Sequence, residues 1–530
     1  MSAGKRIVIL GGGFAGVYTA RALEKRLQPD EASITLVNRE NYFVYQPMLP
    51  EVISGSIGIT DIVSPIRLLC PRTHLVMREV EEIDLGRRVV TVSPGFHPRR
   101  LELPYDHLVI ALGGITNFYG MPGMFEHALP FRTLVDALTL RNRVISCMEE
   151  ADVERDAGLR RRLLTFVVGG GGFSGVEVIA ELNDFVRAVA RRYRNIPAGE
   201  IRCVLVHSGE RILPEMDPAL AEFAQRLLAK RGVELRLKDR LVAATSEKAI
   251  LKTGGDIPAK TIVSTVPSAV SPVLRQLECA KEKDRLLVNG HLEVQGQEGV
   301  VWALGDCASI KTAAGNVAPP TAQHATREAE TAAHNMAAVI RGGSKTVFAF
   351  EGLGKLGALG HNSAVAEVFG FKISGLLAWF LWRSIYLMKM PGLNRKVRIA
   401  ADWFIALLFP PDLVQLSLRA EGGILEQHFE PGEVVFHQGD VGDCVYVIRK
   451  GACDVLRMNG EQEHLLATLG PGEYFGEMAV LSGHGRNATV RAQTAMDVLL
   501  ISKADFDQLK SNVPAFGDVF SKLAASRAQR

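Results

Sequence analysis

Runs of consecutive apolar residues that end at a glycine turn are the clearest pattern in the chain. The run "RIVIL" (6–10) leads into "GGGFAG", and "LTFVV" (164–168) leads into "GGGGFSG". Apolar runs of this length are typical of strands that are covered on both faces, as in parallel sheets. After each turn the apolar residues follow the helical period. The pattern therefore predicts two α/β units, each built on a strand, a turn and a helix.

The glycines of both turns have the spacing G-x-G-x-x-G, which is specific when a strand precedes it and a helix follows. The first glycine permits the tight turn, the second lets the backbone approach a pyrophosphate, and the third lets the helix pack close to the strand. The phosphate then lies at a helix N-terminus. We expect two dinucleotide sites, one at Gly11, Gly13, Phe14, Ala15 and Gly16, the other at Gly170, Gly172 and Gly175.

Two dinucleotide sites in one chain are the arrangement of flavoproteins in which a nicotinamide coenzyme reduces a flavin. Two further strand ends are consistent with FAD: "YDHLVIALGG" ends in Gly113 and Gly114, and "GVVWALGDCAS" contains Gly305 and Asp306. In flavin enzymes of this class the aspartate of such a turn bonds the ribityl or phosphate part of FAD. The alternative for Asp306 is an ordinary turn residue.

Composition excludes several classes of function. The formal net charge of the 530 residues is only +3 and the cations are spread along the chain, so nucleic acid is not an expected partner. The seven cysteines are scattered without close pairs, so we predict no disulfide framework, no dithiol centre and no metal site. The N-terminus passes directly into a strand and leaves no room for a signal peptide. We therefore expect a protein of the reducing cytoplasm.

Three stretches resemble type II NADH dehydrogenases, which are single-subunit, FAD-containing NADH:quinone oxidoreductases. They are "RENYFVYQPMLPEVISGSI" (39–57), "PPTAQHA" (319–325) and the long stretch from "SAVAEVFGFKISGLLAWF" to "WFIALLFPPDLVQL" (363–416). The similarity extends over about residues 5 to 416. It implies a respiratory-chain enzyme that transfers electrons from NADH through FAD to a membrane quinone without pumping protons, and that forms a homodimer.

The resemblance also assigns roles to residues. The first glycine turn, Gly113, Gly114, Gly305 and Asp306 would hold FAD, and the second turn would hold NADH. Glu177 matches a family glutamate beside the nicotinamide and flavin ring, although a glutamate there also complements the helix dipole. Gln323 matches the first glutamine of a family pattern A-Q-x-A-x-Q-Q at the quinone end of the flavin. Thr321 and Ala322 would begin a helix whose positive end faces the flavin.

Several residues depart from the family pattern. The two later glutamines are Arg327 and Glu328 here, so we expect a reshaped quinone pocket or a different acceptor. Asn38, followed by Arg39, stands where an acidic residue usually holds the adenosine ribose of FAD, and both are expected to contact the cofactor. His207 stands at the corresponding place in the nicotinamide unit, where an acid would select NADH. We expect NADH as the coenzyme, with NADPH possible.

Residues 371–416 contain three of the four tryptophans, Trp379, Trp382 and Trp403. The uncharged run from Ile373 to Trp382 is too short to cross about 30 Å of hydrocarbon, which needs about 20 residues. Tryptophans near the cations Lys389, Arg395, Lys396 and Arg398 are typical of amphipathic helices that lie on a membrane surface, with the aromatic rings among the headgroups. The alternative is a buried helical pair with a dimer interface.

From Ile424 onward, short alternating segments are separated by Pro-Gly and Gly-Asp turns, which predicts a small β-roll. The stretches "PGEVVFHQGDVGDCVYVIRKGACDVL" and "FGEMAVLSGHGRNATV" resemble cyclic-nucleotide-binding domains. The resemblance implies that Arg486 neutralises the cyclic phosphate, that backbone groups near Gly476 and Ala488 add donors, and that Glu477 accepts from the ribose. Asn487 replaces a frequent serine or threonine, so cyclic AMP and cyclic GMP both remain candidates. A roll without ligand is the alternative.

We therefore expect an α/β chain with two Rossmann-like domains for FAD and NAD(P)H, an amphipathic interface segment and a C-terminal β-roll. The expected boundaries are 1–130 and 285–345 for the FAD domain, 131–284 for the NAD(P)H domain, 346–416 for the segment and 417–530 for the roll. The expected location is the cytoplasmic face of the inner (plasma) membrane, as a peripheral protein. Two alternatives remain: a sulfide:quinone oxidoreductase of the same fold, which the scattered cysteines disfavour, and a redox-inactive nucleotide sensor.

Overall fold

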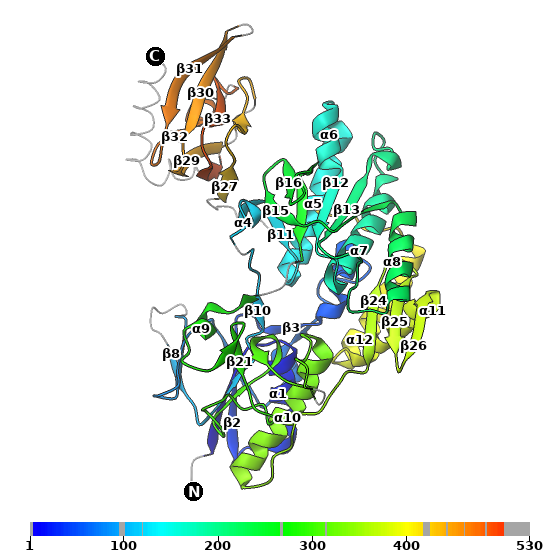
Figure 1. Ribbon diagram of the computed structural model, residues 1–530, viewed down its shortest axis with the longest axis vertical. Coiled ribbons are helices and arrows are strands. Elements are labelled where there is room, and N and C mark those ends of the chain that lie inside the picture. Colours follow the sequence, from blue (N-terminus) through cyan, green and yellow to red (C-terminus); the bar gives the residue numbers. More distant parts are fainter. Residues whose placement is uncertain are drawn as a thin grey trace.

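The computed structural model of the chain describes residues 4–94, 101–118, 120–265, 269–312, 315–416, 425–440, 442, 444–459, 462–482 and 485–502. The expected boundary at residue 417 and the part of the expected roll domain beyond residue 502 lie outside these residues. Figure 1 shows a lower α/β part that contains the N-terminus, an upper α/β part, and the roll beside the upper part.

The first glycine turn belongs to a five-stranded parallel sheet. Its central strand β1 (Lys5–Leu10) is buried from Ile7 to Leu10, because it has a neighbour on each side and layers above and below. The helices α1 (Phe14–Arg26) and α10 (Ala322–Arg341) pack against each other beside this sheet. The strands lie in the order β22 (Val301–Ala303), β9 (His107–Ile110), β1, β2 (Ala32–Asn38) and β5 (His74–Met77).

The second glycine turn belongs to a second five-stranded parallel sheet, so the two α/β units predicted from the turns are confirmed. Its strand β12 (Thr165–Gly169) is buried at every residue. The order is β11 (Ala128–Pro130), β18 (Thr261–Ser264), β12, β13 (Arg202–His207) and β14 (Val233–Leu237). The helices of this unit are α5 (Leu134–Val153), α6 (Ala157–Leu163), α7 (Phe173–Ala190) and α8 (Pro218–Lys230).

The chain passes between the two units at two points that pair with each other. These are β10 (Gly114–Ile115) and β19 (Ala269–Val270), which form a short antiparallel ladder, and α4 (Met124–His127) follows the first. The remaining short helices of the α/β parts are α2 (Glu51–Ser54), α3 (Ile66–Leu69) and α9 (Pro272–Arg275). Smaller sheets are formed by β3 (Tyr42–Val44) with β4 (Val63–Pro65); β6 (Val80–Asp84), β7 (Val89–Val92) and β8 (Leu101–Pro104); β15 (Leu241–Ala244), β16 (Lys248–Leu251) and β17 (Asp256–Pro258); and β20 (Lys281–Glu282), β21 (Arg285–Leu287) and β23 (Ala308–Ser309).

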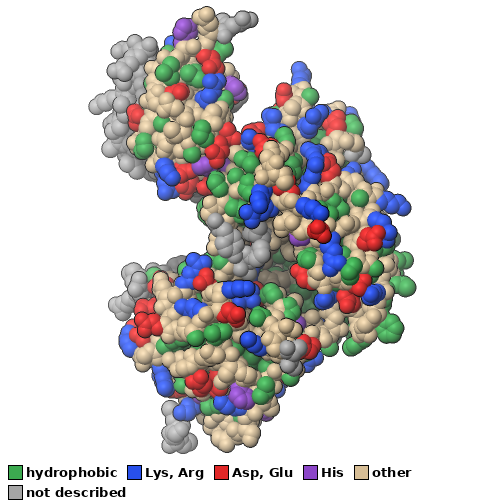
Figure 2. All heavy atoms as spheres, in the orientation of Figure 1, with side chains coloured by type: hydrophobic (Ala, Val, Ile, Leu, Met, Phe, Trp, Pro, Cys, Tyr) green, Lys and Arg blue, Asp and Glu red, His purple; other side chains and the backbone are tan. Residues whose placement is uncertain are grey.

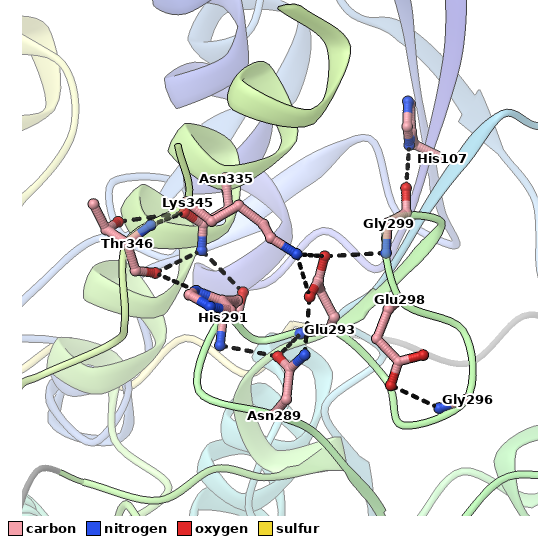
Figure 3. A network of polar contacts seen from close by, with 10 residues as sticks. All are labelled: His107, Asn289, His291, Glu293, Gly296, Glu298, Gly299, Asn335, Lys345 and Thr346. Carbon is pink, nitrogen blue, oxygen red and sulfur yellow. Dashed lines mark hydrogen bonds and ion pairs between the residues drawn. The ribbon is translucent and has the colours of Figure 1, made fainter. Parts of the chain in front are cut away.

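A buried ion pair ties the segment after α10 to the first unit (Figure 3). Glu293 is fully buried and accepts two hydrogen bonds from Lys345 Nζ, at 2.8 and 2.9 Å. Asn289 Nδ2 also donates to Glu293, at 2.9 Å. Although burial opposes ionisation, these donors lower the pKa of Glu293. Asn335, on α10, donates to the carbonyls of His291 and Thr346, so the network holds both ends of this connection.

A three-stranded antiparallel sheet precedes the helices of the expected interface segment. It consists of β24 (Gly354–Ala358), β25 (Ala364–Val368) and β26 (Phe371–Gly375), and α11 (Leu376–Lys389) packs on it. A second helix, α12 (Leu393–Leu408), follows. Within the described ranges, no helix combines the length and the apolarity that crossing a bilayer demands.

The C-terminal part is a β-roll of two four-stranded antiparallel sheets, as the alternating pattern predicts. One sheet has the order β27 (Leu425–Phe429), β34 (Met496–Ser502), β29 (Cys444–Lys450) and β32 (Tyr474–Phe475). The other has the order β28 (Val434–Phe436), β33 (Thr489–Ala492), β30 (Cys453–Asn459) and β31 (Gln462–Leu469), and the helix α13 (Glu477–Ser482) completes the unit. Figure 2 shows a notch that separates the roll from the lower α/β part.

Candidate active site

The first glycine turn leaves an open space at one glycine and none at the other two. A side chain at Gly11, whose φ is +106°, would place its Cβ 2.2 Å from the carbonyl oxygen of Ala111. At Gly16 the Cβ would lie 1.9 Å from the carbonyl oxygen of Gly11. At Gly13, which caps α1, a Cβ would meet nothing within 4 Å. The fold itself therefore requires glycine at positions 11 and 16, for the tight turn and for the close approach of the helix, whereas the space at Gly13 is left for a ligand.

The second turn repeats this geometry. Gly170 has φ +118°, and a Cβ at Gly175 would lie 1.9 Å from the Gly170 carbonyl oxygen. At Gly172, which caps α7, the nearest atom to a Cβ would be Glu215 Oε1 at 4.0 Å. Each unit thus presents a helix N-terminus behind an open glycine, which is the arrangement that binds a pyrophosphate. The residues of both turns fit dinucleotides.

Asn38 and His207 have the same structural task in the two units. Asn38 ends β2 and its Oδ1 accepts a hydrogen bond from the Gly12 amide, at 2.9 Å. His207 ends β13 and its Nδ1 accepts from the Gly171 amide, at 3.1 Å. Burial lowers the pKa of His207, and an Nδ1 that accepts requires the neutral ring with its proton on Nε2. Arg39 lies on the surface, 3.4 Å from Glu79.

A cavity of about 1310 Å³ lies between the two units. Its lining brings together residues predicted separately from the sequence, namely Phe14 at the start of α1, Glu177 on α7, Asp306, and Ala322 and Gln323 at the start of α10. Asp306 lies 3.5 Å from Arg132, and Gly305 before it has φ +70°. Gly113 has φ +61°, and Gly114 begins β10. Among the described residues that line the cavity there is no cysteine.

Glu177 is held at the cavity wall in a form that can carry a proton. Its Oε1 accepts a hydrogen bond from the Ala358 amide at 3.0 Å, which connects α7 to β24. Burial raises the pKa of Glu177 to about 8, and the nearby carboxylate of Glu51 adds to the rise. At neutral pH the side chain is therefore largely protonated and can donate to a group in the cavity.

Gln323, in the cavity wall, is fixed by two hydrogen bonds to the backbone of other lining residues. Its Oε1 accepts from the Leu353 amide and its Nε2 donates to the Gly354 carbonyl, both at 3.1 Å. Thr321 caps α10, so the positive end of this long helix points into the cavity. The side chain of Gln323 thus positions the loop before β24 relative to α10.

The two residues that depart from the family pattern have different surroundings. Arg327 lines the cavity and lies 5.7 Å from the ring centre of Phe350. Glu328 is buried beside the Gly305 turn instead, and its Oε2 accepts from the Gly305 amide at 2.8 Å. Burial raises the pKa of Glu328 to about 7. Of the two departures, the one that changes the lining of this cavity is Arg327.

The three tryptophans of the expected interface segment are buried, which corrects the expectation that their rings lie among headgroups. Trp379 and Trp403 lie on either side of the Arg383 guanidinium, whose carbon is 3.9 and 4.4 Å from the ring centres. Trp403 Nε1 donates to Glu51 at 2.7 Å, and Arg383 lies 3.4 Å from the same carboxylate. Trp379 and Trp403 face inward because they cover this buried ion pair, whereas Trp382 packs against the ring of Tyr386. This assembly was not predicted, since its members come from distant parts of the chain.

Exposed apolar side chains do occupy the outer faces of α11 and α12. Phe380 on α11 is 55 % exposed, and Phe404 and Leu408 on α12 are each 63 % exposed. Part of the basic charge nearby is used internally, because Arg395 lies 3.2 Å from Asp61 and Lys396 donates to the Met388 carbonyl.

In the roll, Arg486 points inward. Its Nη1 donates to the carbonyls of Gly476 and Cys444, at 2.7 and 3.0 Å, and the guanidinium carbon lies 4.2 Å from the ring centre of Phe436. Glu477 and Ala488 are buried nearby, and Asn487 is exposed. The five residues expected at the ligand site are thus all present in one region of the roll, with the arginine held by protein carbonyls.

Comparisons with known proteins agree with this architecture. The family model for pyridine nucleotide-disulphide oxidoreductase matches residues 5–329, that for the NDH2 C-terminal domain matches 353–412, and that for the cyclic nucleotide-binding domain matches 426–512. Demethylphylloquinone reductase NdbB of Synechocystis is 31 % identical, over 75 % of this chain and 95 % of its own. The type II NADH:quinone oxidoreductase NdhA of Mycobacterium tuberculosis is 29 % identical, over 76 % and 87 %.

Among solved structures, NDH2 from Plasmodium falciparum in complex with NADH superposes with a TM-score of 0.70 over 77 % of this chain and 99 % of its own, at 18 % identity. At that identity the likeness concerns the fold, which agrees with the two parallel sheets described above. The chain belongs to the pyridine nucleotide-disulphide oxidoreductase family and, within it, to the type II NADH dehydrogenases, and it carries a cyclic nucleotide-binding domain.

Proposed function

We propose that the chain transfers electrons from NADH through FAD to a membrane quinone at the cavity between its two nucleotide units. The proposal rests on one observation, that a single cavity is lined by the first residues of three helices, α1, α7 and α10. The first two helices follow the two glycine turns, and α10 follows the Asp306 region. Gly11, Gly13, Phe14, Ala15 and Gly16, with Asn38, Arg39, Gly113, Gly114, Gly305, Asp306 and Ala322, would hold FAD. The second turn would hold NADH.

Bound FAD supplies the redox chemistry, because it accepts a hydride from a nicotinamide and passes two electrons to a quinone. The residues of the chain position the reacting groups and place charges beside them. Glu177, protonated at neutral pH, can donate to the acceptor, and the α10 N-terminus favours negative charge at the flavin end of the cavity. Arg327 adds a positive charge where the family has glutamine, so we expect the acceptor side to differ from that of relatives.

The experiment is anaerobic reduction of the purified, flavin-loaded protein. NADH should bleach the flavin spectrum, and a quinone should restore it. Gly172→Ala fills the open space of the second turn, so it should abolish bleaching by NADH while dithionite still bleaches the flavin. A wild-type protein that holds flavin but does not respond to NADH would favour the redox-inactive sensor. Oxidation of sulfide instead of NADH would favour the sulfide:quinone oxidoreductase, for which the seven cysteines, six of them buried, offer little support.

We also propose that the apolar faces of α11 and α12 bind a membrane surface, on the cytoplasmic side. Phe404 and Leu408 are one helical turn apart and exposed, and Arg398, which lies 3.6 Å from Asp61, is six residues before Phe404. Phe404→Ser with Leu408→Ser should lose flotation with anionic vesicles. Val153→Ser, at an equally exposed apolar residue on α5, is the matched control. If these variants still float but no longer form dimers in sedimentation experiments, the face is a homodimer interface.

The roll is proposed to bind cyclic AMP or cyclic GMP and to regulate the enzyme through α4. His127 Nε2 lies 2.7 Å from the His428 carbonyl oxygen of β27, so the roll contacts the short helix between β10 and β11, where the chain passes from one unit to the other. The two protein carbonyls occupy Nη1 of Arg486, so a cyclic phosphate would bind the remaining donors of this guanidinium or displace the carbonyls. A ligand that binds one arrangement better shifts the population toward it.

Calorimetry with both cyclic nucleotides should give one site per chain, and Arg486→Lys should weaken it. His127→Ala removes the contact with β27 without touching the ligand site, so it should bind nucleotide normally while quinone reductase activity no longer responds. Absence of binding by the wild type would leave a structural roll. Binding that changes turnover equally in wild type and His127→Ala would refute the route through α4.

A further inference from the structure

The ring of His207 is packed against the second glycine turn and is not open to a ligand. Its Nδ1 accepts from the Gly171 amide at 3.1 Å, and its Nε2 is buried. A Cβ at Gly171 would lie 2.4 Å from the Cγ of His207, and one at Gly209 would lie 2.7 Å from its Nε2. Dinucleotide sites usually have an acid at this strand end, where it bonds the adenosine ribose. Here the ring serves the fold, so a ribose needs another acceptor.

The loop after β13, residues 208–217, is tied to the same glycine turn. The Leu213 amide donates to the Gly171 carbonyl at 2.7 Å. Lys355, on β24, donates from its Nζ to the Glu215 carbonyl. Because the glycine turn holds the loop on one side and β24 holds it on the other, the backbone of Glu215 is fixed beside the dinucleotide site.

The carboxylate of Glu215 lies at the open glycine of the second turn. Its Oε1 is the atom nearest to a Cβ at Gly172, at 4.0 Å, and the residue is an exposed part of the cavity lining. Burial lowers the pKa of His207 and the charge of Glu215 opposes this shift, so the carboxylate is also close to the end of β13. In the described part of the chain Glu215 forms no ion pair. Its oxygens can therefore accept from a ligand at the second turn.

The other charged side chains of this loop are engaged elsewhere. The Nη2 of Arg211 donates to two carbonyls of its own loop, at 3.3 and 3.5 Å. Glu210 lies 3.0 Å from Lys238, and its side chain is 84 % exposed. Asp217 caps α8. Of the charged side chains of the loop, which the structure describes in full, Glu215 is the one that lines the cavity.

We propose that Glu215 selects NADH over NADPH, because its carboxylate accepts from the hydroxyls of the adenosine ribose and repels a 2′-phosphate at the same place. This inference rests on the proposed function, which puts NADH at the second turn. The negative charge comes from the loop after β13, whereas dinucleotide sites usually take it from the strand end. Glu215 does not touch the reacting atoms, so it determines which coenzyme binds and has no part in hydride transfer.

The test compares the two coenzymes on the flavin-loaded full chain. In calorimetry Glu215→Gln should bind NADP⁺ about tenfold or more tightly than the wild type does, because the repulsion of the phosphate is removed. NAD⁺ should bind no more tightly than before. With NADH and NADPH as reductants, the ratio of kcat/KM values should fall by a similar factor. Glu215→Asp keeps the charge and should keep the preference for NADH. Glu210→Gln removes one charge from the same loop and is the control, which should behave as the wild type.

A gain in NADP⁺ affinity separates coenzyme selection from support of the loop, because damage to the loop would weaken both coenzymes. An unchanged affinity ratio in Glu215→Gln would overturn the assignment, as would equal weakening of both coenzymes or the same gain in Glu210→Gln. A wild type that binds NAD⁺ but does not reduce its flavin with NADH would overturn the proposed function, while the ratio of the two affinities would still decide the role of Glu215.

Discussion

A methyl group added at two glycines of the first turn should have different effects, namely loss of flavin binding at one and loss of stability at the other. At Gly13 the backbone is extended, with φ −82° and ψ −165°, and a Cβ would meet nothing within 4 Å. Gly13→Ala therefore introduces no clash. The reduced freedom of the unfolded chain stabilises the protein by about 0.4–1 kcal/mol, and the loss of glycine at the N-cap of α1 costs a similar amount, so the free energy of unfolding of the flavin-free protein should change by less than about 1 kcal/mol. The same methyl fills the space through which the pyrophosphate approaches the backbone, so flavin binding should be lost.

At Gly16 the added methyl group should instead lower the stability of the flavin-free protein. The added Cβ would lie 1.9 Å from the Gly11 carbonyl oxygen, so α1 must move away from the turn. Gly16→Ala should lower the free energy of unfolding of the flavin-free protein by about 1–3 kcal/mol, as overpacked sites do. Urea titrations of flavin-free samples give the stabilities, and the flavin spectrum of purified protein gives the occupancy. Full flavin occupancy in Gly13→Ala would refute the phosphate site, and a flavin-free Gly13→Ala destabilised as strongly as Gly16→Ala would refute the open space.

Three further predictions concern single side chains. His207→Glu places a negative charge at the end of β13 and should raise the preference for NADH over NADPH, as a ratio of kcat/KM values, by about tenfold or more. Because burial raises the pKa of Glu328, the free energy of unfolding should be highest below pH 4.5 and should fall by about 3 kcal/mol as the pH rises to about 7. Glu328→Gln, which can still accept from Gly305, should remove this slope in urea titrations at several pH values. Lys345→Met leaves the fully buried Glu293 without its cation and should lower the free energy of unfolding by about 3 kcal/mol in the same titrations. This value is at the low end for buried pairs because Lys345 is 31 % exposed. An unchanged midpoint would contradict the role given to this network.

Features of the chain that depend on near neighbours could be derived from the sequence. The two glycine turns are predictable because the need for positive φ at Gly11 and Gly170, and for close packing at Gly16 and Gly175, arises within one strand-turn-helix unit. Glu177 was expected through the resemblance to the family, which has a glutamate directly after the second turn. The alternating segments of the roll likewise predicted antiparallel strands, because the side-chain period of a strand is local.

Which distant segments pack together could be learned only from the tertiary structure. Trp403 and Glu51 are 352 residues apart, and their hydrogen bond explains why tryptophans expected at a membrane surface are buried. A helical pattern shows that a segment has an apolar face but not what that face covers, because the inward direction depends on partners far along the chain. The place of Glu177 on α7 is visible in the sequence, whereas the cavity that it lines exists only once α7 packs against α2 and β24, because those partners come from segments far apart in the chain.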